Sequence, residues 1–597
     1  MTHSNRVISI YNRFLSFLHT KQRVACFLLL AAVLLVYANV INGGFVYDDK
    51  SFIVDNRPVK EWLFSRPWDF FIKPEVAVWS GIYRPLRTLS FAIDYQLFGL
   101  NPVGYHCENV LLHCINTLLV FSILSVLLAC TKKGFLGALL FAVHPVQLEA
   151  VSWISSRGDL LFALFVLISF KWYISMTDDE RIKWTSISGL LLLYIFALLS
   201  KETAIAFFPV VISYDILIMC CQKKINLYYM VKKRLKIYLS IAGISLLYLI
   251  IRFNLFESVS QKPYWGGSVK SNILTMLEAT LYYFKIIFYP VKLSIDYSNY
   301  PIIYSFADIR LIMPVLFYTA VALLCFYALR RKDYPFILFA GIFVLFLLPS
   351  WNIFPISAII AERFLYVSLI GVAAVAGCVL YTICFENHTI FQRKICFLTV
   401  LFIFLCLSFL SIYRNSHWFS NYTIWKACVD VFPGNYKGHI NLGTEYEEKG
   451  EHYKAISENI KLLVVKPHHA TAHYNLGNIY WRLGLFDKSR AAFLTAIRYN
   501  PEYWQAMNNL GSLYVDKMWY DEAERVFLQL IVKNPDYPKA HFNLASIYFN
   551  RFKDYPKAKY HLRKCIESEM FRNSKEVHFM WRNIEIIDRE TSGIGSR

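Results

Sequence analysis

Long apolar blocks with few charges are the feature that most limits how this chain can fold. Of its 597 residues, 56% are hydrophobic, and between residues 24 and 413 they come in runs of roughly 15 to 25. A helical run of this length matches the thickness of a bilayer core. We therefore expect a polytopic membrane helix bundle of about eleven spans, near 24-40, 108-130, 134-144, 159-175, 184-200, 203-221, 236-252, 309-329, 335-350, 356-383 and 394-413.

The distribution of charge agrees with a membrane protein. The formal net charge is +20, and many of the basic residues lie in short loops between apolar blocks, as in QKKINLYYMVKKRLK and RRKDYP. Basic loops of this kind are typical of the cytoplasmic side. No nucleic-acid-binding motif is visible, so we exclude nucleic acid as a partner. The 13 cysteines lack CxxC or paired spacing and indicate neither a zinc site nor a disulfide framework.

The C-terminal part is an internal repeat. Asn-Leu-Gly begins at Asn441, Asn475 and Asn509, Asn-Leu-Ala begins at Asn543, and each step is 34 residues. This period is typical of tetratricopeptide repeats, which stack into an all-α solenoid suited to binding a peptide or a protein. We expect a basic cytoplasmic N-terminus (1-23), a membrane domain (24-413) with an outer loop (41-106), a linker (414-430) and a domain of about four repeats (431-590).

One segment decides which side of the membrane the repeats occupy. Residues 272-290 carry Glu278 and Lys285, and a charge at mid-membrane costs roughly 2.5–3.5 kcal/mol on insertion scales. If this segment spans, the repeats lie in the cytoplasm. If it lies in the interface, every basic loop is cytoplasmic, which is the arrangement that we favour. The repeats then share the outer side with the first loop.

Charged residues gather on that outer side. They are Asp48, Asp49, Arg84 and His106 in the first loop, His144, Glu149, Arg157 and Asp159 in the second, Lys201 and Glu202 in the third, and Glu362 and Arg363 in the last. Cations beside a membrane can bind a lipid-linked phosphate, and a carboxylate can take a proton from a hydroxyl group. Several buried charges on one face of a membrane bundle indicate a functional site.

Each of these residues also has a purely structural interpretation. Lys201 and Glu202 could neutralise each other, as could Glu362 and Arg363. Asp94 could pair with Arg87, Asp48–Asp49 could be a solvated pair, and His144–Pro145 could be only a turn. A functional site predicts that Asp48, Asp49, Arg84, Lys201 and Arg363 line one cavity, whereas a scaffold predicts that the charges are dispersed or neutralised in pairs.

Several motifs resemble one known family. FVYDDKSFIVDN, YRPLRTLSFAIDY, GYHCENVLLH, HPVQLEAVSWISSRGD, KETAIAFF and AERFLYV, followed by the repeats, are similar to the transmembrane and tetratricopeptide-repeat protein O-mannosyltransferases. These are polytopic glycosyltransferases of the GT-C architecture, and they have prokaryotic relatives. The resemblance covers nearly the whole chain, although this chain has few repeats and a compact central region.

The resemblance implies an activity and roles for particular residues. It implies transfer of a sugar, with mannose favoured, from a polyprenyl-phosphate donor to a Ser or Thr hydroxyl of a protein on the extracytoplasmic or lumenal side, with inversion. Asp48 or Asp49 would be the base, with Asp49 slightly favoured. Arg84, Lys201 and Arg363 would bind the donor phosphate. His106, His144, Glu149, Arg157, Asp159, Glu202 and Glu362 would support them.

Several alternatives stay open. The aspartates could instead bind a divalent cation, although no metal is required by a carrier with a single phosphate. The chain could be a lipid-linked glycan ligase or flippase, or a non-enzymatic membrane scaffold with a peptide-binding solenoid. Its compactness favours the plasma membrane of a prokaryote over the endoplasmic reticulum membrane.

Overall fold

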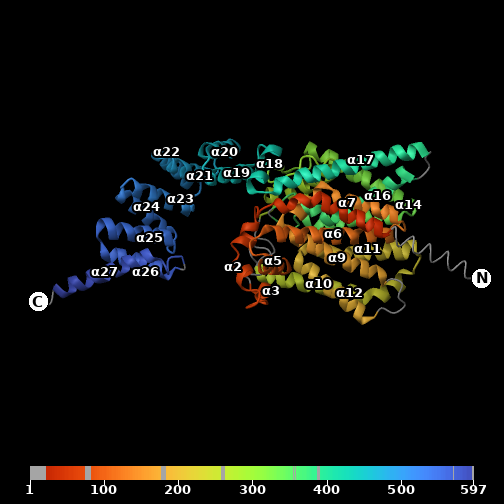
Figure 1. Ribbon diagram of the computed structural model, residues 1–597, viewed down its shortest axis with the longest axis horizontal. Helices are drawn as coiled ribbons and strands as arrows, with labels where there is room; N and C mark the ends of the chain where they lie inside the picture. The colour runs from red at the N-terminus through yellow and green to blue at the C-terminus, as the bar shows by residue number, and fades with distance from the viewer. Residues whose placement is uncertain are drawn as a thin grey trace, which may run out of the picture. The chain divides into compact units, whose positions relative to one another are not determined.

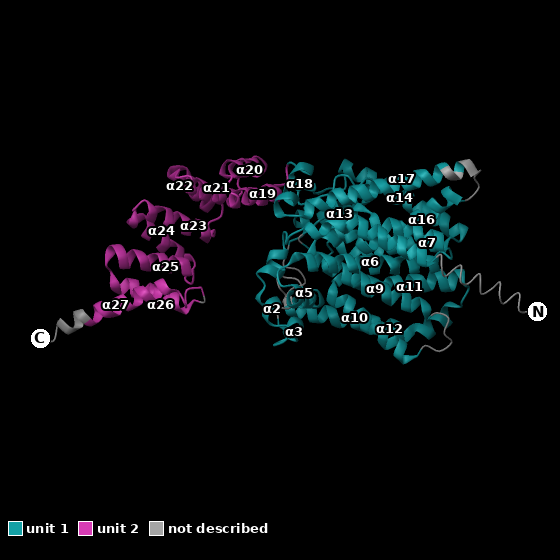
Figure 2. Cartoon of the chain, in the orientation of Figure 1, with its two compact units in different colours: residues 1–433 teal, residues 434–597 magenta. Residues whose placement is uncertain are grey.

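The computed structural model describes residues 22–73, 83–176, 183–256, 263–353, 355–356, 358–385, 390–568 and 570–594. Within them every regular element is a helix, as predicted. The chain divides into two compact units, 1–433 and 434–597 (Figure 2). Nearly all of the predicted N-terminal segment 1-23 falls outside the described residues. The segment that we predicted as a linker, 414-430, includes much of the helix α18 (Asn421–Val431), and the predicted domain boundaries stay a prediction.

Unit 1 is a bundle of long apolar helices lying side by side (Figure 1). Its main helices are α6 (Pro102–Leu127), α7 (Thr131–Val143), α9 (Arg157–Ser175), α10 (Trp184–Ser200), α11 (Phe207–Tyr214), α12 (Leu227–Phe256), α14 (Ile312–Arg331), α15 (Tyr334–Leu347), α16 (Leu365–Phe385) and α17 (Ile390–Asn415).

Eight helices in the described part of the chain are long and apolar enough to cross a membrane, and a bent pair makes a ninth. The eight are Gln22–Asn42, Pro102–Leu127, Ile154–Ser175, Glu202–Gln222, Leu227–Leu255, Ile309–Arg331, Glu362–Phe385 and Ile395–Trp418; the pair is Thr131–Val143 with Pro145–Ser152. The predicted count of eleven is not confirmed, because two predicted spans are the shorter helices Trp184–Ser200 and Tyr334–Ser350. A span needs about 20 residues.

Small residues allow two of these helices to pack closely. A Cβ atom at Gly377 of α16 would lie 2.5 Å from the carbonyl oxygen of Lys133, and one at Gly137 of α7 would lie 2.7 Å from that of Ala373. Glycine removes the side chains that would hold the two backbones apart, which is a common way to join membrane helices.

The first loop forms a folded layer at one end of the bundle. It contains the short helices α2 (Arg57–Glu61) and α3 (Asp69–Ile72) and the longer α5 (Pro85–Phe98), seen together in Figure 1. A small core of Phe52, Phe70, Phe91 and Tyr105 packs these elements against Ile154, the first residue of the 3-10 turn Ile154–Ser156 that leads into α9. The layer therefore fixes the Asp48–Asp49 segment against the start of α9.

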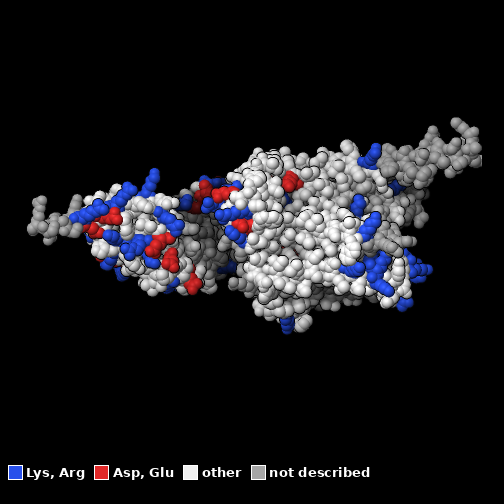
Figure 3. Space-filling model, turned by 90° about the horizontal axis from the view of Figure 1, so that it is seen from below, with Lys and Arg blue, Asp and Glu red and all other residues white. Residues whose placement is uncertain are grey.

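One face of unit 1 has a wide middle with few charged side chains (Figure 3). Figure 3 shows few charged side chains across the middle of this face, and Lys and Arg gather at one end. Exposed basic residues such as Lys223, Lys224, Lys232 and Lys236 belong to the connection between η7 (Asp215–Gln222) and the first turns of α12. The helix α13 (Val269–Phe288), which holds Glu278 and Lys285, is not among the candidate spans.

Unit 2 is built from helix pairs. The described residues contain α19 (Tyr436–Glu448) with α20 (His452–Val465), α21 (Ala470–Arg482) with α22 (Phe486–Tyr499), α23 (Trp504–Asp516) with α24 (Tyr520–Lys533), α25 (Pro538–Ile547) with α26 (Tyr555–Glu567), and a final α27 (Lys575–Ile594). Glycines in the first helix of a pair admit an aromatic ring of the second. A Cβ atom at Gly477 would lie 2.6 Å from Phe493, and one at Gly511 would lie 2.5 Å from Phe527.

Candidate active site at one end of the bundle

The four segments that carry the predicted site residues meet at one end of the bundle. Asp49 bonds to Ser155, Arg84 to Glu202, Lys201 to Asp159, and Arg363 to Glu149. Each of these contacts joins two segments that are distant in the sequence. The structure therefore brings together charges that the sequence places in separate loops.

Asp49 is a buried anchor of the first loop. Its Oδ2 accepts a hydrogen bond from the Val46 amide at 3.0 Å, and its Oδ1 accepts one from the Ser155 amide at 2.8 Å and another from the Ser155 hydroxyl. Complete burial raises the pKa of Asp49 to about 7, although these hydrogen bonds act to lower it. Each oxygen of this carboxylate is thus occupied by protein donors.

Asp48 differs from its neighbour because its side chain is partly exposed. The residue before it, Tyr47, has a φ of 55°, a left-handed conformation that is costly for an aromatic residue. The Tyr47 amide donates to Asn421 Oδ1 at 2.7 Å, which helps to hold this conformation. The strained turn thus lies between the buried Val46 and the partly exposed Asp48.

The three cations predicted to bind phosphate are each paired with a carboxylate. Arg84 makes two hydrogen bonds to Glu202, at 3.2 Å and 2.9 Å. Lys201 contacts Asp159, and Arg363 contacts Glu149 through both its guanidinium group and, at 2.9 Å, its backbone amide. The proposed neighbour pairs, Lys201 with Glu202 and Glu362 with Arg363, are therefore not the pairs that form.

Lys201 and Arg363 lie beside the same aromatic ring. The ring centroid of Phe364 is 5.3 Å from Lys201 Nζ and 5.2 Å from Arg363 Cζ. Both cations also line a cavity of about 10 Å³ together with Asp159, which is room for about one water molecule. Neither aspartate of the first loop lines this cavity. Of the five residues that a functional site predicts in one cavity, only Lys201 and Arg363 line this one. The charges are also paired, as a scaffold predicts.

Arg157 holds the outer layer to the bundle. Its fully buried guanidinium contacts Asp94 and donates to Glu108 at 2.8 Å, to Asn109 Oδ1 at 2.9 Å and to the Tyr105 carbonyl at 3.0 Å. Asp94 therefore pairs with Arg157 and not with Arg87. This network indicates a structural role for Arg157.

The remaining predicted residues also anchor the site. Glu362 accepts hydrogen bonds from the Ser294 amide at 2.7 Å and from the Tyr297 hydroxyl at 2.9 Å. His144 lies at the bend after α7, and its Nε2 bonds to the Ile287 carbonyl at 2.9 Å. His106 is buried against Gly43. In the described ranges no group of three or more His, Cys, Asp or Glu side chains could hold a metal ion.

Sequence reasoning missed three residues of this site: Ser155 holds Asp49, Phe364 lies beside two cations, and Tyr297 binds Glu362. Arg87, considered only as a partner of Asp94, is a buried arginine near the start of α5. The motif YRPLR contains two arginines three positions apart, yet the sequence does not show which of them meets a carboxylate. Ser155 and Tyr297 carry no signal in a single sequence, because their role depends on a distant partner.

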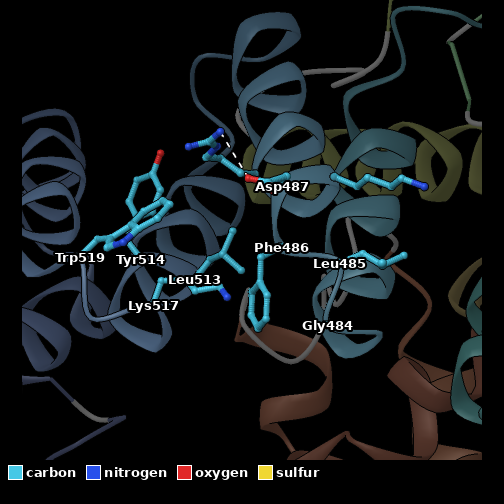
Figure 4. Close-up of a pocket in the computed structure, with 10 residues that line it drawn as sticks. Gly484, Leu485, Phe486, Asp487, Leu513, Tyr514, Lys517 and Trp519 are labelled. Carbon is cyan, nitrogen blue, oxygen red and sulfur yellow. Dashed lines mark ion pairs between the residues drawn. The ribbon is translucent and has the colours of Figure 1, made fainter.

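Unit 2 has a separate surface cleft. It has a volume of about 490 Å³ and lies between the second and third helix pairs (Figure 4). Aromatic Phe486, Tyr514 and Trp519 line it together with the basic residues Lys488, Arg490 and Lys517. Arg490 pairs with Asp487 at 3.5 Å, the dashed line in Figure 4, and Lys517 Nζ lies 3.6 Å from the Phe486 ring centroid. The cleft therefore combines apolar surface with positive charge.

The fold and the site define a class: a helical membrane protein with a charged cluster at one end of its bundle and a C-terminal solenoid. The repeats match the tetratricopeptide repeat model over residues 440–497, 474–517 and 520–564, which confirms the repeat type predicted from the sequence. Among solved structures, the crystal structure of MamA is 23% identical and covers 24% of this chain and 85% of its own, with a TM-score of 0.23.

The predicted resemblance is confirmed by curated relatives named protein O-mannosyl-transferase. Human TMTC4 is 29% identical over 487 residues, which cover 71% of this chain and 64% of the relative. Human TMTC1 is 27% identical over 75% of this chain and 56% of the relative, and Drosophila melanogaster Tmtc1 is 40% identical over 151 residues. The matched part is therefore about half to two thirds of the length of the two human relatives.

Proposed function

We propose that this protein is a membrane glycosyltransferase that moves a mannosyl residue from a polyprenyl-phosphate carrier to a Ser or Thr hydroxyl of a protein. The observation that carries the proposal is the set of cations and carboxylates from four separate segments at one end of the bundle. The relatives are named protein O-mannosyl-transferase, which supports mannose as the sugar and a protein as the acceptor. The helical bundle and the first loop are compatible with the GT-C architecture that the family resemblance implies.

Asp48 is the base in this proposal. Its partial exposure gives an acceptor hydroxyl access, whereas both oxygens of Asp49 already accept protein hydrogen bonds. The hydroxyl oxygen attacks the anomeric carbon as its proton passes to Asp48, and the bond from that carbon to the phosphate oxygen breaks. A single displacement of this kind inverts the anomeric centre and releases the polyprenyl phosphate. Asp49 positions the loop.

Arg84, Lys201 and Arg363 contact the donor phosphate in this proposal. Each is held in place by its carboxylate partner, and its contacts within the described residues leave further N–H groups to donate to a ligand. Pairing fixes their orientation before substrate arrives, which lowers the reorganisation needed in the transition state. Glu149, Asp159 and Glu202 thus orient cations, and Glu362, His106, His144 and Arg157 hold the surrounding backbone.

We place the site on the lumenal or extracytoplasmic side. Exposed lysines between η7 and α12 lie at the end of α12 remote from Arg252, which approaches Glu202 at 3.9 Å. Basic loops on the side opposite the site agree with the charge rule for cytoplasmic loops. The animal relatives favour the endoplasmic reticulum membrane over the prokaryotic plasma membrane that the sequence suggested.

The repeat unit recruits the protein acceptor in this proposal. The cleft of Figure 4 has three basic side chains against one acidic one, so its charge suits an acidic segment that also carries an apolar side chain. Replacing Lys488 and Lys517 by Glu should raise the KM for a protein acceptor with kcat little changed. An unchanged KM would show that the acceptor is held elsewhere.

Sugar transfer in nanodiscs tests the proposed activity. The full chain would be supplied with polyprenyl-phosphate mannose, glucose or N-acetylglucosamine and a Ser/Thr-rich polypeptide. We expect mannosylated Ser or Thr with the anomeric configuration opposite to that of the donor. Movement of the lipid across the bilayer without transfer would favour a flippase. Neither activity with any donor would favour a scaffold.

A further inference from the structure

Arg87 stands apart from the other buried cations of the site. Arg84, Arg157, Lys201 and Arg363 each contact a carboxylate within 4 Å. Arg87 is only 2% exposed, and among the described residues it makes no side-chain hydrogen bond or ion pair. Among the described residues at this end of the bundle, Arg87 is therefore a buried cation without a hydrogen-bonded or ion-paired partner.

The surroundings of Arg87 place it inside the charged cluster. Its guanidinium carbon lies 4.2 Å from the ring centroid of Phe52, which follows Asp48 and Asp49 in the chain, and 5.9 Å from that of Phe91. A Cβ atom at Gly158 would lie 3.5 Å from Arg87 Cδ and 3.7 Å from Arg84 Cδ. Arg87 thus packs beside Arg84 against the first turn of α9, next to Asp159.

A buried cation without a hydrogen-bonded or ion-paired partner is costly and needs an explanation. Removing a charge from water costs several kcal/mol in real proteins unless another charge or hydrogen bonds compensate. Burial and the neighbouring Arg84 lower the pKa of Arg87 to about 9, although Glu202, Asp48 and Asp159 act to raise it. Two of those three carboxylates are already bonded to Arg84 and Lys201.

The cation–carboxylate pairs attract an anion only weakly. Each pair is nearly neutral, so Arg84, Lys201 and Arg363 donate hydrogen bonds but add little net positive charge. A guanidinium group can bind a phosphate through two parallel hydrogen bonds. An incoming phosphate would give Arg87 the direct partner that the described part of the chain does not provide.

We propose that Arg87 binds the phosphate group of the lipid-linked donor directly and supplies the net positive charge of that subsite. The proposal deepens the proposed function and rests on it for the identity of the ligand. It assigns the paired cations to orientation of the phosphate and Arg87 to its attraction.

Binding without sugar transfer tests the proposal. The full chain in nanodiscs would be titrated with polyprenyl monophosphate, with the uncharged polyprenol, and with inorganic phosphate as a competitor. We expect Arg87→Gln to weaken binding of the monophosphate at least tenfold, to leave polyprenol binding unchanged, and not to lower the Tm of the unliganded protein. Arg87→Lys, which keeps the charge, should bind with intermediate affinity.

A matched arginine serves as the control. Arg234 is also buried and lies 4.6 Å above the ring of Tyr173, but it has a carboxylate, Asp215, at 3.7 Å. Arg234→Gln should lower the Tm and leave monophosphate binding unchanged. The proposal is overturned if Arg87→Gln binds the monophosphate like wild type, or if both Arg87 variants lose Tm and polyprenol binding together. Because no sugar is present, binding through Arg87 can hold even if transfer fails.

Discussion

At the scale of single residues, the two neighbouring aspartates have different environments. Asp49 accepts hydrogen bonds from Val46 and Ser155, and Asp48 is partly exposed. The sequence DD indicates a carboxylate site but cannot separate the two, because Ser155 lies 106 positions away in the chain. The slight sequence preference for Asp49 as the base is therefore replaced by a proposal for Asp48.

A buried histidine pair in unit 2 predicts a loss of stability in acid. His541 Nδ1 and His561 Nδ1 are 2.9 Å apart, and His541 Nε2 lies 2.7 Å from the Pro535 carbonyl. Burial, with a smaller contribution from the neighbouring His541, lowers the pKa of His561 to about 4. The unfolded chain therefore binds a proton near pH 6.5 that the folded chain excludes.

The stability that depends on neutral His561 is complete above about pH 6.5 and declines as the pH falls toward 4. Hydrogen exchange of the α25 and α26 amides, corrected for intrinsic rates, should rise over this range. In His561→Phe, which keeps a ring to stack on Tyr548, the added acid sensitivity should disappear. Equal acid sensitivity in the variant would contradict this assignment.

At the scale of elements, the turn inside each repeat shows a local mismatch. Gly450 and Gly484 occupy the left-handed region with φ of 73° and 70°, and Met518 stands at the equivalent position 34 residues on, with φ of 59°. Glycine adopts this conformation without the steric cost that other residues bear. Met518 is 70% exposed and contributes little packing.

Met518→Gly should therefore stabilise the third helix pair by about 0.5–1 kcal/mol. Slower hydrogen exchange in α23 and α24 would measure the gain. The matched change Gly484→Ala should have the opposite sign, with a loss of about 1 kcal/mol in α21 and α22. A destabilising Met518→Gly would mean that the Met518 side chain makes a contact that matters more than backbone strain.

Elements were predictable from the sequence where their signal is local. The apolar blocks predict single helices, and the 34-residue period predicts pairs of neighbouring helices. The structure contains both the long apolar helices and the helix pairs. The pairing of Lys201 with Asp159 and of Arg84 with Glu202 was not predictable, since adjacent charges gave simpler alternatives. Burial of Arg87 without a partner likewise depends on how α5 packs against α9.

At the scale of the whole molecule, the topology predicts on which side of the membrane the first loop and the repeats lie. If α13 does not span, the repeats and the first loop share one side. Protease recognition sequences inserted after Arg66, Lys224 and Lys449 would be tested in sealed microsomes with external protease. We expect cleavage only at the insertion after Lys224. Cleavage after Lys449 with protection after Arg66 would place the repeats in the cytoplasm and would mean that α13 spans.

The central claim is that Asp48 takes the proton from the acceptor hydroxyl. The most direct measurement is the single-turnover rate of mannose transfer by wild type, Asp48→Asn and Asp55→Asn, an exposed aspartate of the same loop. We predict at least a hundredfold loss for Asp48→Asn with an unchanged Tm and unchanged donor binding, and a normal rate for Asp55→Asn. A wild-type rate in Asp48→Asn would contradict the account and remove Asp48 from the chemistry.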